Sequence, residues 1–434
     1  MTQMPNDGIA HVREIPFNNK KTSTEEQHTM SEETERYILE HRNDDVRQLA
    51  LKRQNNSSID MAYALQQIDG WQRAKTKLPT WAATDGIIFP PHISMEQCSS
   101  EATATYKQNL AKGAKMADLT GGFGVDFSFL SRNFSHATYV ERQEHLCQTA
   151  QHNFSVLGLN NTSVVCSDAE TYLNSLTETL DLIYLDPARR DDNGKKTYAI
   201  TDCTPDVVCL MPSLLQHARK VIIKLSPMLD ITEAVNQLGC IDEVHVISVK
   251  NECKEMLLVA NSEAAHDSLK IVCVNDDSIY TANETCEEKT GKYASNPIAG
   301  SAPEVGDMLL VPNASVMKVG CFSSLTDRFD IQKLDPNTHL FIAKNADFIE
   351  YTKSTLLYTF PGKTYQISAV SSMNSRDLRN TLNGITHANI AVRNYPMTAD
   401  QIRKKLKLKD GGDTYIFITR MAQKHIAIIT KKIS

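Results

Sequence analysis

Four carboxylates in the middle of the chain each stand at the end of a β-rich run. They are Asp118, Glu141, Asp168 and Asp186, and helix-length segments separate the runs. Parallel strands joined by helices bring their carboxyl ends to one edge of a sheet, where a carboxylate can accept both hydroxyls of a ribose. The pattern therefore predicts a site for a nucleoside-containing ligand at that edge.

A glycine-rich turn follows the first of these strands, in the stretch M-A-D-L-T-G-G-F-G-V-D that begins at Met116. Glycine lets the backbone turn sharply and approach a ligand because it has no Cβ. The third glycine of a dinucleotide fingerprint would fall on Phe127, whose bulk argues against a bound pyrophosphate. What remains is a D-x-T-x-G-x-G pattern of Asp118, Thr120, Gly122 and Gly124.

A fifth strand is predicted over residues 220–225, and two β-rich runs over 244–249 and 256–260 complete an α/β domain over residues 97–263. Lys224, at the end of the fifth strand, is expected to face the same cleft as the four carboxylates. The alternative interpretation is an unrelated nucleotide-binding or structural α/β sheet.

The loop D-P-A-R-R after the fourth strand, residues 186–190, carries groups that a reaction could use. Asp186 can orient, and deprotonate, an amine or a ring nitrogen. Arg189 or Arg190 can hold a neighbouring phosphate, or can instead pair with Asp191 and Asp192.

Length and composition are those of a soluble globular protein with two to four domains. Of the 434 residues, 41% are hydrophobic and 23% are charged. No apolar run approaches membrane-spanning length and the polar N-terminus lacks a signal core, so a cytoplasmic protein is expected. Ten cysteines without a C-x-x-C pair predict reduced thiols and no metal site, and Cys203 is interpreted as a structural thiol.

Charge is distributed unevenly along the chain, whose net charge is −6. Residues 361–434 hold 13 Lys and Arg against 4 Asp and Glu, whereas residues 1–360 hold 33 against 48. A basic end on an acidic body indicates that this end meets a polyanion. The alternative is a solvated basic helix.

The segments before the glycine turn predict a disordered N-terminus over residues 1–30 and a helical domain over 31–96. A helix over residues 96–112 is expected to lead into the first strand, with Ser99 or Ser100 as its cap. Ser99, Ser100 and Lys107 could contact the ligand, or could serve as caps and solvent-facing charge.

Residues 264–360 predict a small α+β module with a long polar loop over 276–301. In the basic end, a helix over residues 398–406 and the residues after it carry an array of long cations suited to phosphate contacts. These cations are Arg403, Lys404, Lys405, Lys407 and Lys409. Tyr395, Tyr415 and Phe417 could stack on bases, although Tyr415 and Phe417 share a strand face and can equally belong to the core.

Several motifs together resemble a family of bacterial class I S-adenosylmethionine-dependent methyltransferases, and the resemblance covers nearly the whole chain after residue 31. The motifs are E-Q-C-S-S-E from Glu96, D-L-T-G-G-F-G-V-D from Asp118, L-D-P-A-R-R from Leu185, K-L-S-P from Lys224 and K-L-K-L-K-D-G-G-D from Lys405. In that family a Rossmann-like domain is followed by a ferredoxin-like module and a C-terminal THUMP-like domain.

The resemblance implies an α/β fold with a Rossmann-like methyltransferase sheet over residues 97–263, a ferredoxin-like module over 264–360 and a THUMP-like RNA-binding domain over 361–434. The cofactor would be S-adenosyl-L-methionine, and the substrate an RNA. The residues expected to bind the cofactor are Asp118, Thr120, Gly122, Gly124, Glu141 and Asp168. The expected catalytic residues are Asp186, Pro187, Arg189 and Lys224.

In related enzymes a [D/N]-P-P-[Y/F/W] tetrad binds an exocyclic amine and stacks a ring on the base. Asp186 and Pro187 match this tetrad, while Ala188 and Arg189 depart from it, so the stacking ring is missing from its usual place. A D-P-P-R variant occurs in several RNA methyltransferases, some of which use a cysteine after the fifth strand to attack pyrimidine C5. This chain has Ser226 there instead.

Three functions remain open from the sequence. The first is methylation of a base nitrogen of structured RNA, either tRNA or rRNA. The second is methylation of a protein or a small molecule, with an incidental basic end. The third is a non-catalytic RNA-binding factor on the same fold.

Overall fold

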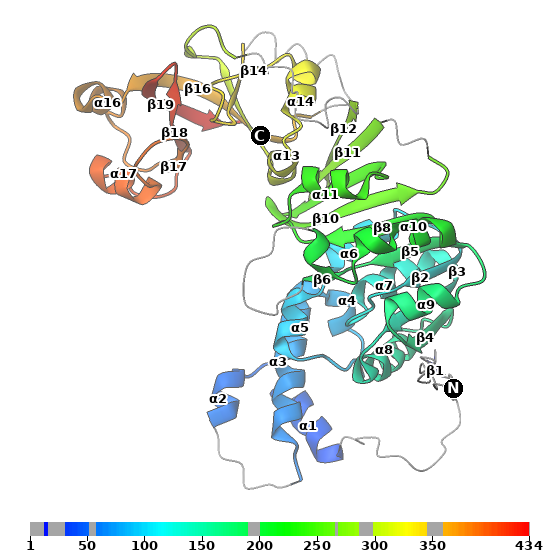
Figure 1. The fold of residues 1–434 in the computed structure, drawn as a ribbon. Coiled ribbons are helices and arrows are strands. Elements are labelled where there is room, and N and C mark those ends of the chain that lie inside the picture. The colour runs from blue at the N-terminus through cyan, green and yellow to red at the C-terminus, as the bar shows by residue number, and fades with distance from the viewer. Residues whose placement is uncertain are drawn as a thin grey trace, which may run out of the picture. The chain divides into compact units, whose positions relative to one another are not determined.

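The computed structural model describes residues 13–15, 31–51, 58–189, 200–264, 268–285, 298–344 and 359–433. These residues form two compact units (Figure 1). The first lies within residues 1–242 and 257–265, and the second within residues 243–256 and 266–434. In the described part of the chain, no helix is long and apolar enough to cross a membrane.

Short helices open the first unit, as the sequence predicts for residues 31–96. They are α1 (Glu32–His41), α2 (Val46–Leu51), α3 (Met61–Lys77), α4 (Pro79–Ala82) and α5 (His92–Gln97). Polar residues begin two of them: Ser31 accepts the Thr34 N–H before α1, and Asp60 accepts the Tyr63 N–H before α3. Of residues 1–30, expected to be disordered, the structure describes only β1 (Arg13–Ile15), a strand antiparallel to β4 (Thr162–Cys166).

The single helix expected over residues 96–112 is wrong, because the structure has two helices there. Helix α5 ends at Gln97, and a separate helix α6 (Glu101–Gln108) begins only after Ser100. Ser100 has an extended backbone and its hydroxyl accepts the Thr103 N–H, which is the geometry of a helix N-cap. The cap residue interrupts the helical pattern, so Cys98 and Ser99 lie in a link that reaches the candidate site.

The sheet of the first unit is built from strands whose order reverses at β2 (Gly113–Asp118). On one side lie β3 (Phe134–Glu141) and then β4, and on the other lie β5 (Leu180–Leu185) and then β8 (Ala218–Leu225). All these neighbours pair in parallel. Ligands of open α/β sheets bind beyond the carboxyl ends of the strands at such a reversal.

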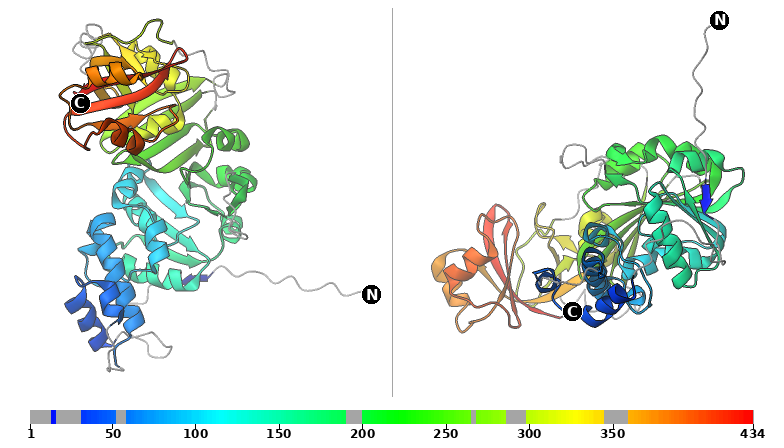
Figure 2. Two further views of the ribbon diagram at one scale, coloured as in Figure 1. Left: turned by 90° about the vertical axis from the view of Figure 1, so that its left-hand side faces the viewer. Right: turned by 90° about the horizontal axis from the view of Figure 1, so that it is seen from below.

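Helices connect the strands and lie on both faces of this sheet (Figure 2). They are α7 (Val125–Leu130), α8 (Glu144–Val156), α9 (Ala169–Ser175), α10 (Val207–His217) and α11 (Ile231–Leu238). Helix α6 packs on α7, and α9 and α11 pack on α10. The N-terminal helices pack here too, because Trp81, Phe89 and Met95 share one buried cluster with Phe123 and Phe129.

In the second unit, β9 (Glu243–Val249) pairs in parallel with β11 (Ser268–Asn275), which pairs antiparallel with β12 (Ser278–Thr285). The strand β12 corrects the first part of the polar loop expected over residues 276–301, of which residues 286–297 lie outside the described residues. Asp276 adopts a positive φ of 51° in the tight turn between β11 and β12, and Tyr280 and Ala282 alternate inward beyond it. Polar residues between these inward positions hide the strand in the sequence.

The rest of the second unit is a seven-stranded sheet, in the order β14-β15-β13-β16-β19-β18-β17. Its strands are β13 (Met308–Pro312), β14 (Gln332–Lys333), β15 (Phe341–Ala343), β16 (Gly362–Ser372), β17 (Asn389–Val392), β18 (Thr414–Met421) and β19 (Lys424–Lys432). Because β13 pairs with β16, residues expected in two modules, 264–360 and 361–434, share this sheet.

Four helices accompany the seven-stranded sheet. They are α13 (Ala314–Val319), α14 (Phe322–Phe329), α16 (Ser375–Thr381) and α17 (Ala399–Leu406). Helix α17 begins with a capping box, in which Thr398 accepts the Gln401 N–H and the Gln401 side chain accepts the Thr398 N–H. Leu378 of α16 and Ile402 of α17 pack on Ile416 and Ile429, which lie on one face of the sheet.

Candidate functional site

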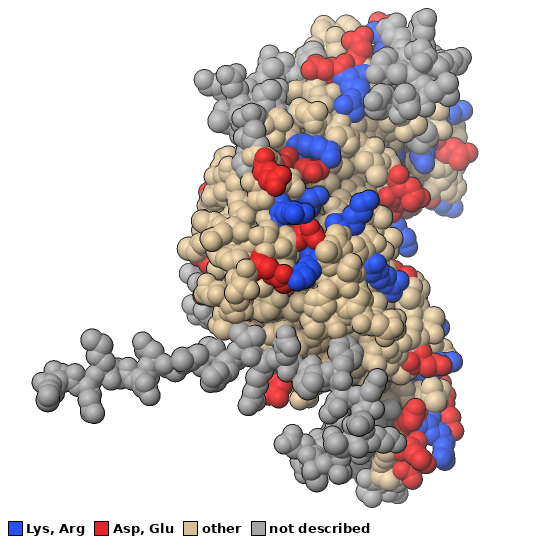
Figure 3. All heavy atoms as spheres, turned by 90° about the vertical axis from the view of Figure 1, so that its right-hand side faces the viewer, with Lys and Arg blue, Asp and Glu red and all other residues tan. Residues whose placement is uncertain are grey.

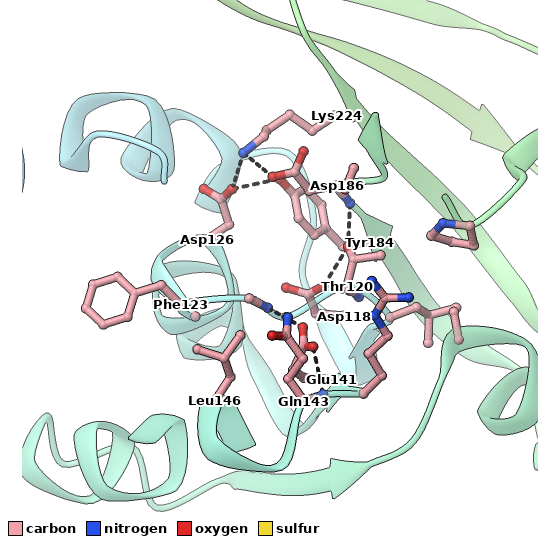
Figure 4. A pocket seen from close by; sticks show the side chains of 18 of the residues that line it. Asp118, Thr120, Phe123, Asp126, Glu141, Gln143, Leu146, Tyr184, Asp186 and Lys224 are labelled. Atoms are coloured by element: carbon pink, nitrogen blue, oxygen red, sulfur yellow. Dashed lines mark hydrogen bonds and ion pairs between the residues drawn. The ribbon is translucent and has the colours of Figure 1, made fainter. Parts of the chain in front are cut away.

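A cavity of about 390 Å³ lies where the strand order of the first unit reverses (Figure 4). Residues at or just after the carboxyl ends of β2, β3, β4, β5 and β8 line it, together with the link between α5 and α6. Eight of the ten expected site residues are among the lining residues: Asp118, Thr120, Gly122, Gly124, Glu141, Asp168, Asp186 and Lys224. Glu141, Asp168 and Asp186 thus share a single cavity.

The glycine turn is pressed against β3. A Cβ on Gly121 would lie 2.1 Å from the ring of Tyr139, and Gly124 adopts a φ of +82° as the N-cap of α7. The Tyr139 hydroxyl donates to the Gly122 carbonyl oxygen. Only glycine fits a turn held this closely, which explains the glycines at positions 121 and 124.

Glu141, at the end of β3, joins the glycine turn to the loop that begins α8. Its two carboxylate oxygens accept the N–H of Gly122 at 3.0 Å and the N–H of Gln143 at 2.9 Å. The residue is buried but still lines the cavity. Each carboxylate oxygen can accept a second hydrogen bond, so Glu141 could also bind hydroxyls of a ligand.

Asp118 and Thr120 connect the ends of β2 and β5. The Asp118 carboxyl is buried and accepts the Thr120 N–H at 3.0 Å, while the Thr120 hydroxyl accepts the Asp186 N–H at 2.5 Å. Burial raises the pKa of Asp118 to about 8. The nearby carboxylates of Asp126 and Asp186 add to this increase, and the hydrogen bond from the Thr120 N–H only partly offsets it. Asp118 is therefore a largely protonated carboxyl at neutral pH.

Asp168 lies at the rim of the cavity and is exposed. It is the N-cap of α9, where it accepts the Thr171 N–H at 2.8 Å and the Thr171 hydroxyl at 2.7 Å. Its partial burial acts to raise the pKa, but these hydrogen bonds outweigh burial and hold the pKa of Asp168 below its ordinary value.

A network of charged side chains, all buried except Asp186, lies at one end of the cavity, opposite Glu141 and Gln143 (Figure 4). The Lys224 ammonium lies 2.5 Å from Asp186 Oδ2 and 3.2 Å from Asp126 Oδ2. Asp126 Oδ1 lies 2.9 Å from the ammonium of Lys107, which is fully buried. Ser99 and Tyr184 both donate to Asp126 Oδ2, at 2.8 Å each.

Asp126 is the functional candidate that the sequence reasoning missed. Burial acts to raise its pKa, but Lys107 and Lys224 outweigh burial, so the pKa lies well below the ordinary value and Asp126 is ionised. The available signal was an acid inside V-D-F-S-F-L, because every residue of this short helix, α7, is buried. A buried acid that is not paired is costly, so a partner could have been sought.

The open question about Ser99, Ser100 and Lys107 has a different answer for each residue. Ser99 lines the cavity, and Ser100 caps α6. Lys107 is neither exposed nor a lining residue, because its ammonium donates to Ser99 Oγ at 2.9 Å and pairs with Asp126. The alternative of solvent-facing charge is therefore wrong for Lys107.

The loop after β5 is described only in part. Pro187 is buried and is not a lining residue of the cavity. The backbone of Arg189 forms β6 (Ala188–Arg189), which pairs with β7 (Cys203–Thr204), whereas the Arg189 side chain and all of Arg190 lie outside the described residues. Cys203 is buried and is likewise not a lining residue.

Comparison with family models matches three separate regions of the chain. Residues 101–204 match a family described as "Conserved hypothetical protein 95", residues 309–348 a ferredoxin-like domain, and residues 362–432 a THUMP domain-like family. The last two regions are the parts of the seven-stranded sheet that β13 and β16 join.

Comparison with whole proteins finds similarity over most of the chain. A crystal structure of a putative methyltransferase from Porphyromonas gingivalis W83 is 29% identical, covers 94% of this chain and 100% of its own, and superposes with a TM-score of 0.78. Two curated proteins from strains of Mycobacterium tuberculosis, each named an uncharacterized S-adenosylmethionine-dependent methyltransferase, are 21% identical over 339 residues. The match covers 78% of this chain and 86% of theirs.

Fold, domain content and these similarities agree with the resemblance found in the motifs. The chain has a methyltransferase-like α/β sheet, a ferredoxin-like module and a C-terminal THUMP-like domain, and it is similar over most of its length to S-adenosylmethionine-dependent methyltransferases.

Proposed function

We propose that this protein methylates a base nitrogen of structured RNA, tRNA or rRNA, with Asp186 as the residue that orients the acceptor. The observation that supports this role is the position of Asp186. Its side chain is 40% exposed at the cavity, while Lys224 holds one of its oxygens at 2.5 Å. A carboxylate held at one oxygen presents the other in a defined direction, which suits an N–H donor.

The residues of the cavity fit S-adenosyl-L-methionine, the methyl donor of this class. Glu141 stands at the end of the second parallel strand, where a carboxylate accepts ribose hydroxyls. Its two backbone bonds leave acceptor capacity on both oxygens. Asp118, Thr120, Gly122, Gly124 and Asp168 complete the proposed binding residues. A cavity of about 390 Å³ is within the range of small-molecule sites.

In the proposed reaction the cofactor supplies an activated methyl group, so the protein has mainly to align the acceptor. Positioning alone can contribute on the order of 7 kcal/mol. Asp186 accepts the N–H of the acceptor base and fixes the direction of its lone pair, and it can receive the proton as the nitrogen is alkylated. Lys224 positions Asp186, and Asp126 positions Lys224, at 2.5 Å and 3.2 Å respectively.

A nitrogen acceptor is favoured over pyrimidine C5. The C5 reaction needs a thiolate in the site. Cys203 is buried and does not line the cavity, and Cys98 lines it but has a pKa raised by burial, which disfavours the thiolate. The proposed contributions of Pro187 and Arg189 are to shape the loop after β5 and to hold a phosphate of the substrate.

RNA is favoured as the substrate because of the basic C-terminal residues. Lys404, Lys405, Lys407 and Lys409 are exposed on and after α17, whereas Arg403 is paired with Asp400 and Asp410. Exposed lysines suit phosphate contacts, so we assign these four, rather than Arg403, to RNA. On the face drawn in Figure 3, basic side chains are mixed with acidic ones among the described residues.

A cytoplasmic location is part of the proposal.

The other candidate functions predict different products. A protein or small-molecule methyltransferase would transfer the methyl group without need of the exposed lysines, and a non-catalytic RNA-binding factor would bind RNA without transfer. Deleting residues 361–434 would not separate these cases, because β13 would lose its partner β16. Point substitutions that keep the sheet intact are needed instead.

The test is methyl transfer from isotope-labelled S-adenosyl-L-methionine to the RNA, protein and small-molecule fractions of cells that lack this protein. Label in RNA with wild-type protein, and its loss with Asp186→Ala, supports the proposal. Label in another fraction, or equal labelling of RNA by Asp186→Ala, contradicts it. Asp230→Ala is a matched control, since Asp230 is an exposed helix cap that does not line the cavity.

A further inference from the structure

A second cavity, of about 360 Å³, lies wholly in the second unit. It opens on the face of the seven-stranded sheet opposite the one that packs on α16 and α17. Strands β13, β16, β17 and β18 contribute to its lining, and so do the turns that follow β9 and β11. The proposed methyl-transfer site does not account for it, and its lining includes Tyr415 and Phe417, which the sequence left open as base-stacking or core residues.

Three aromatic rings form the floor of this cavity: Tyr365, Tyr415 and Phe417. The ring of Tyr365 packs 5.0 Å from that of Tyr415 and 4.9 Å from that of Phe417, measured between centroids. Tyr365 and Phe417 are buried, whereas Tyr415 is only half-buried. Tyr365, which packs on Phe417, therefore supports the ring of Tyr415, and Tyr415 keeps surface that a flat ligand could cover.

The rest of the lining combines apolar residues, among them Val311, Phe360 and Ile390, with basic and amide side chains. Lys363 and Arg393 are exposed at the rim, four asparagines line the walls, and none of the described lining residues is acidic. The asparagines are Asn251, Asn275, Asn313 and Asn389. Asn389 stands opposite Tyr415 in the pairing of β17 with β18, so an amide lies beside the ring. Asn275 Oδ1 has no hydrogen-bond partner among the described residues.

We propose that this cavity binds one unpaired nucleotide of an RNA, with its base stacked on Tyr415 and its phosphate bound by Lys363 or Arg393. Aromatic rings on a sheet stack on bases, amides bond to the edges of bases, and cations without neighbouring carboxylates attract phosphate. The positive charge of the lining does not distinguish a phosphate from an acidic peptide. The flat ring and the amides together match a nucleobase, which favours a nucleotide.

This inference rests on the proposed function, because it places part of the RNA substrate. It also requires that the bound RNA has an unpaired base, which phosphate contacts by basic residues would not require. Stacking is tolerant of sequence, so the cavity contributes preference for single-stranded over duplex RNA rather than for a particular base.

The test measures binding of a fluorescently labelled short single-stranded RNA to the full chain, without cofactor. Tyr415→Ala is expected to weaken binding about tenfold. Tyr415→Phe keeps the ring and is expected to bind within about twofold of wild type. Tyr63→Ala is the matched control, because Tyr63 is a half-buried tyrosine of α3 that lines neither cavity.

The same RNA annealed to its complement is expected to bind with an affinity that Tyr415→Ala does not change. The inference is overturned if Tyr415→Ala melts at the wild-type temperature and binds the single strand as wild type does. It is also overturned if Tyr415→Phe loses as much affinity as Tyr415→Ala.

The readout is independent of methyl transfer, so the two proposals can fail separately. Binding through Tyr415 without any labelling of RNA by the protein would reject the proposed function and keep the nucleotide site. If the protein labels RNA and Tyr415→Ala binds the single strand with wild-type affinity, the proposed function is kept and the nucleotide site is rejected.

Discussion

The ammonium of Lys107 lies 2.9 Å from Asp126 Oδ1, and both side chains are buried, although only Asp126 lines the cavity. Asp126 in turn contacts Lys224, and Lys224 contacts Asp186 at the cavity. Two lysines and two aspartates thus alternate from the interior to the site. The pairing matters because a buried charge without a partner is strongly unfavourable.

Replacing Lys107 tests whether this network supports the fold. Lys107→Met leaves Asp126 with one cation instead of two, so we expect a loss of about 3–5 kcal/mol in the free energy of unfolding. Urea denaturation measures it. Lys112→Met, at an exposed position just beyond α6, should change stability by less than about 0.5 kcal/mol. Equal stability of the two variants would contradict the role given to Lys107.

Glu141→Ala is expected to weaken binding of S-adenosyl-L-methionine tenfold or more. The substitution removes the acceptor for the N–H groups of Gly122 and Gln143, and hydrogen bonds to a charged group contribute about 1.5–3 kcal/mol. Isothermal titration calorimetry measures the affinity. Glu144→Ala removes an exposed carboxylate on the first turn of α8 and should bind as wild type does. Unchanged affinity in Glu141→Ala would count against this cavity as the cofactor site.

Asp118→Asn tests the raised pKa of that carboxyl. Because burial raises the pKa to about 8, the folded chain keeps this proton between about pH 4 and pH 8, where the unfolded chain has lost it. The stability contributed by this group is complete below the unfolded pKa and is lost as pH rises towards 8. The asparagine has no proton to lose, so the variant should gain stability relative to wild type by up to about 1.4 kcal/mol per pH unit.

The measurement is the free energy of unfolding of both proteins at several pH values within that window. The prediction concerns how the difference between the two free energies of unfolding changes with pH, since other groups titrate alike in the two proteins. A difference that stays constant from about pH 5 to pH 8 would mean that Asp118 ionises normally.

Lys404→Gln combined with Lys405→Gln tests the exposed cations of α17. If both contact phosphates, RNA affinity should fall and the slope of log K against log salt should decrease in magnitude by about 1.4–1.8. Filter binding over a range of salt concentrations measures the slope. The control Lys112→Gln removes one exposed positive charge elsewhere in the chain, and its slope should stay that of wild type. An unchanged slope in the double variant would remove α17 from the RNA-binding surface.

The sequence predicted the parallel strands and the clustering of their carboxylates because both depend on local patterns. Apolar runs ending in an acid, separated by helices, fix the edge at which Asp118, Glu141, Asp168 and Asp186 meet. The glycine turn was equally predictable, since positive φ and close packing restrict position 124 to glycine.

Long-range pairing explains what the sequence did not predict. Lys107 looks like a surface lysine in its own helix, and only α7 brings Asp126 to it. Residues 278–285 look like a polar loop until β11 pairs with them, and β13 and β16 look like parts of separate modules until they pair with each other. Propensity and periodicity carry no information about such partners.

The central claim is that Asp186 orients a base nitrogen of RNA for methylation, and nucleoside analysis of cellular RNA tests it most directly. Total RNA from cells lacking this protein would be compared, by mass spectrometry, with RNA from the same cells supplied with wild-type protein or with Asp186→Ala. The account predicts one N-methylated nucleoside that disappears without the protein, returns with wild type and stays absent with Asp186→Ala. Identical nucleoside profiles in all three samples would contradict it.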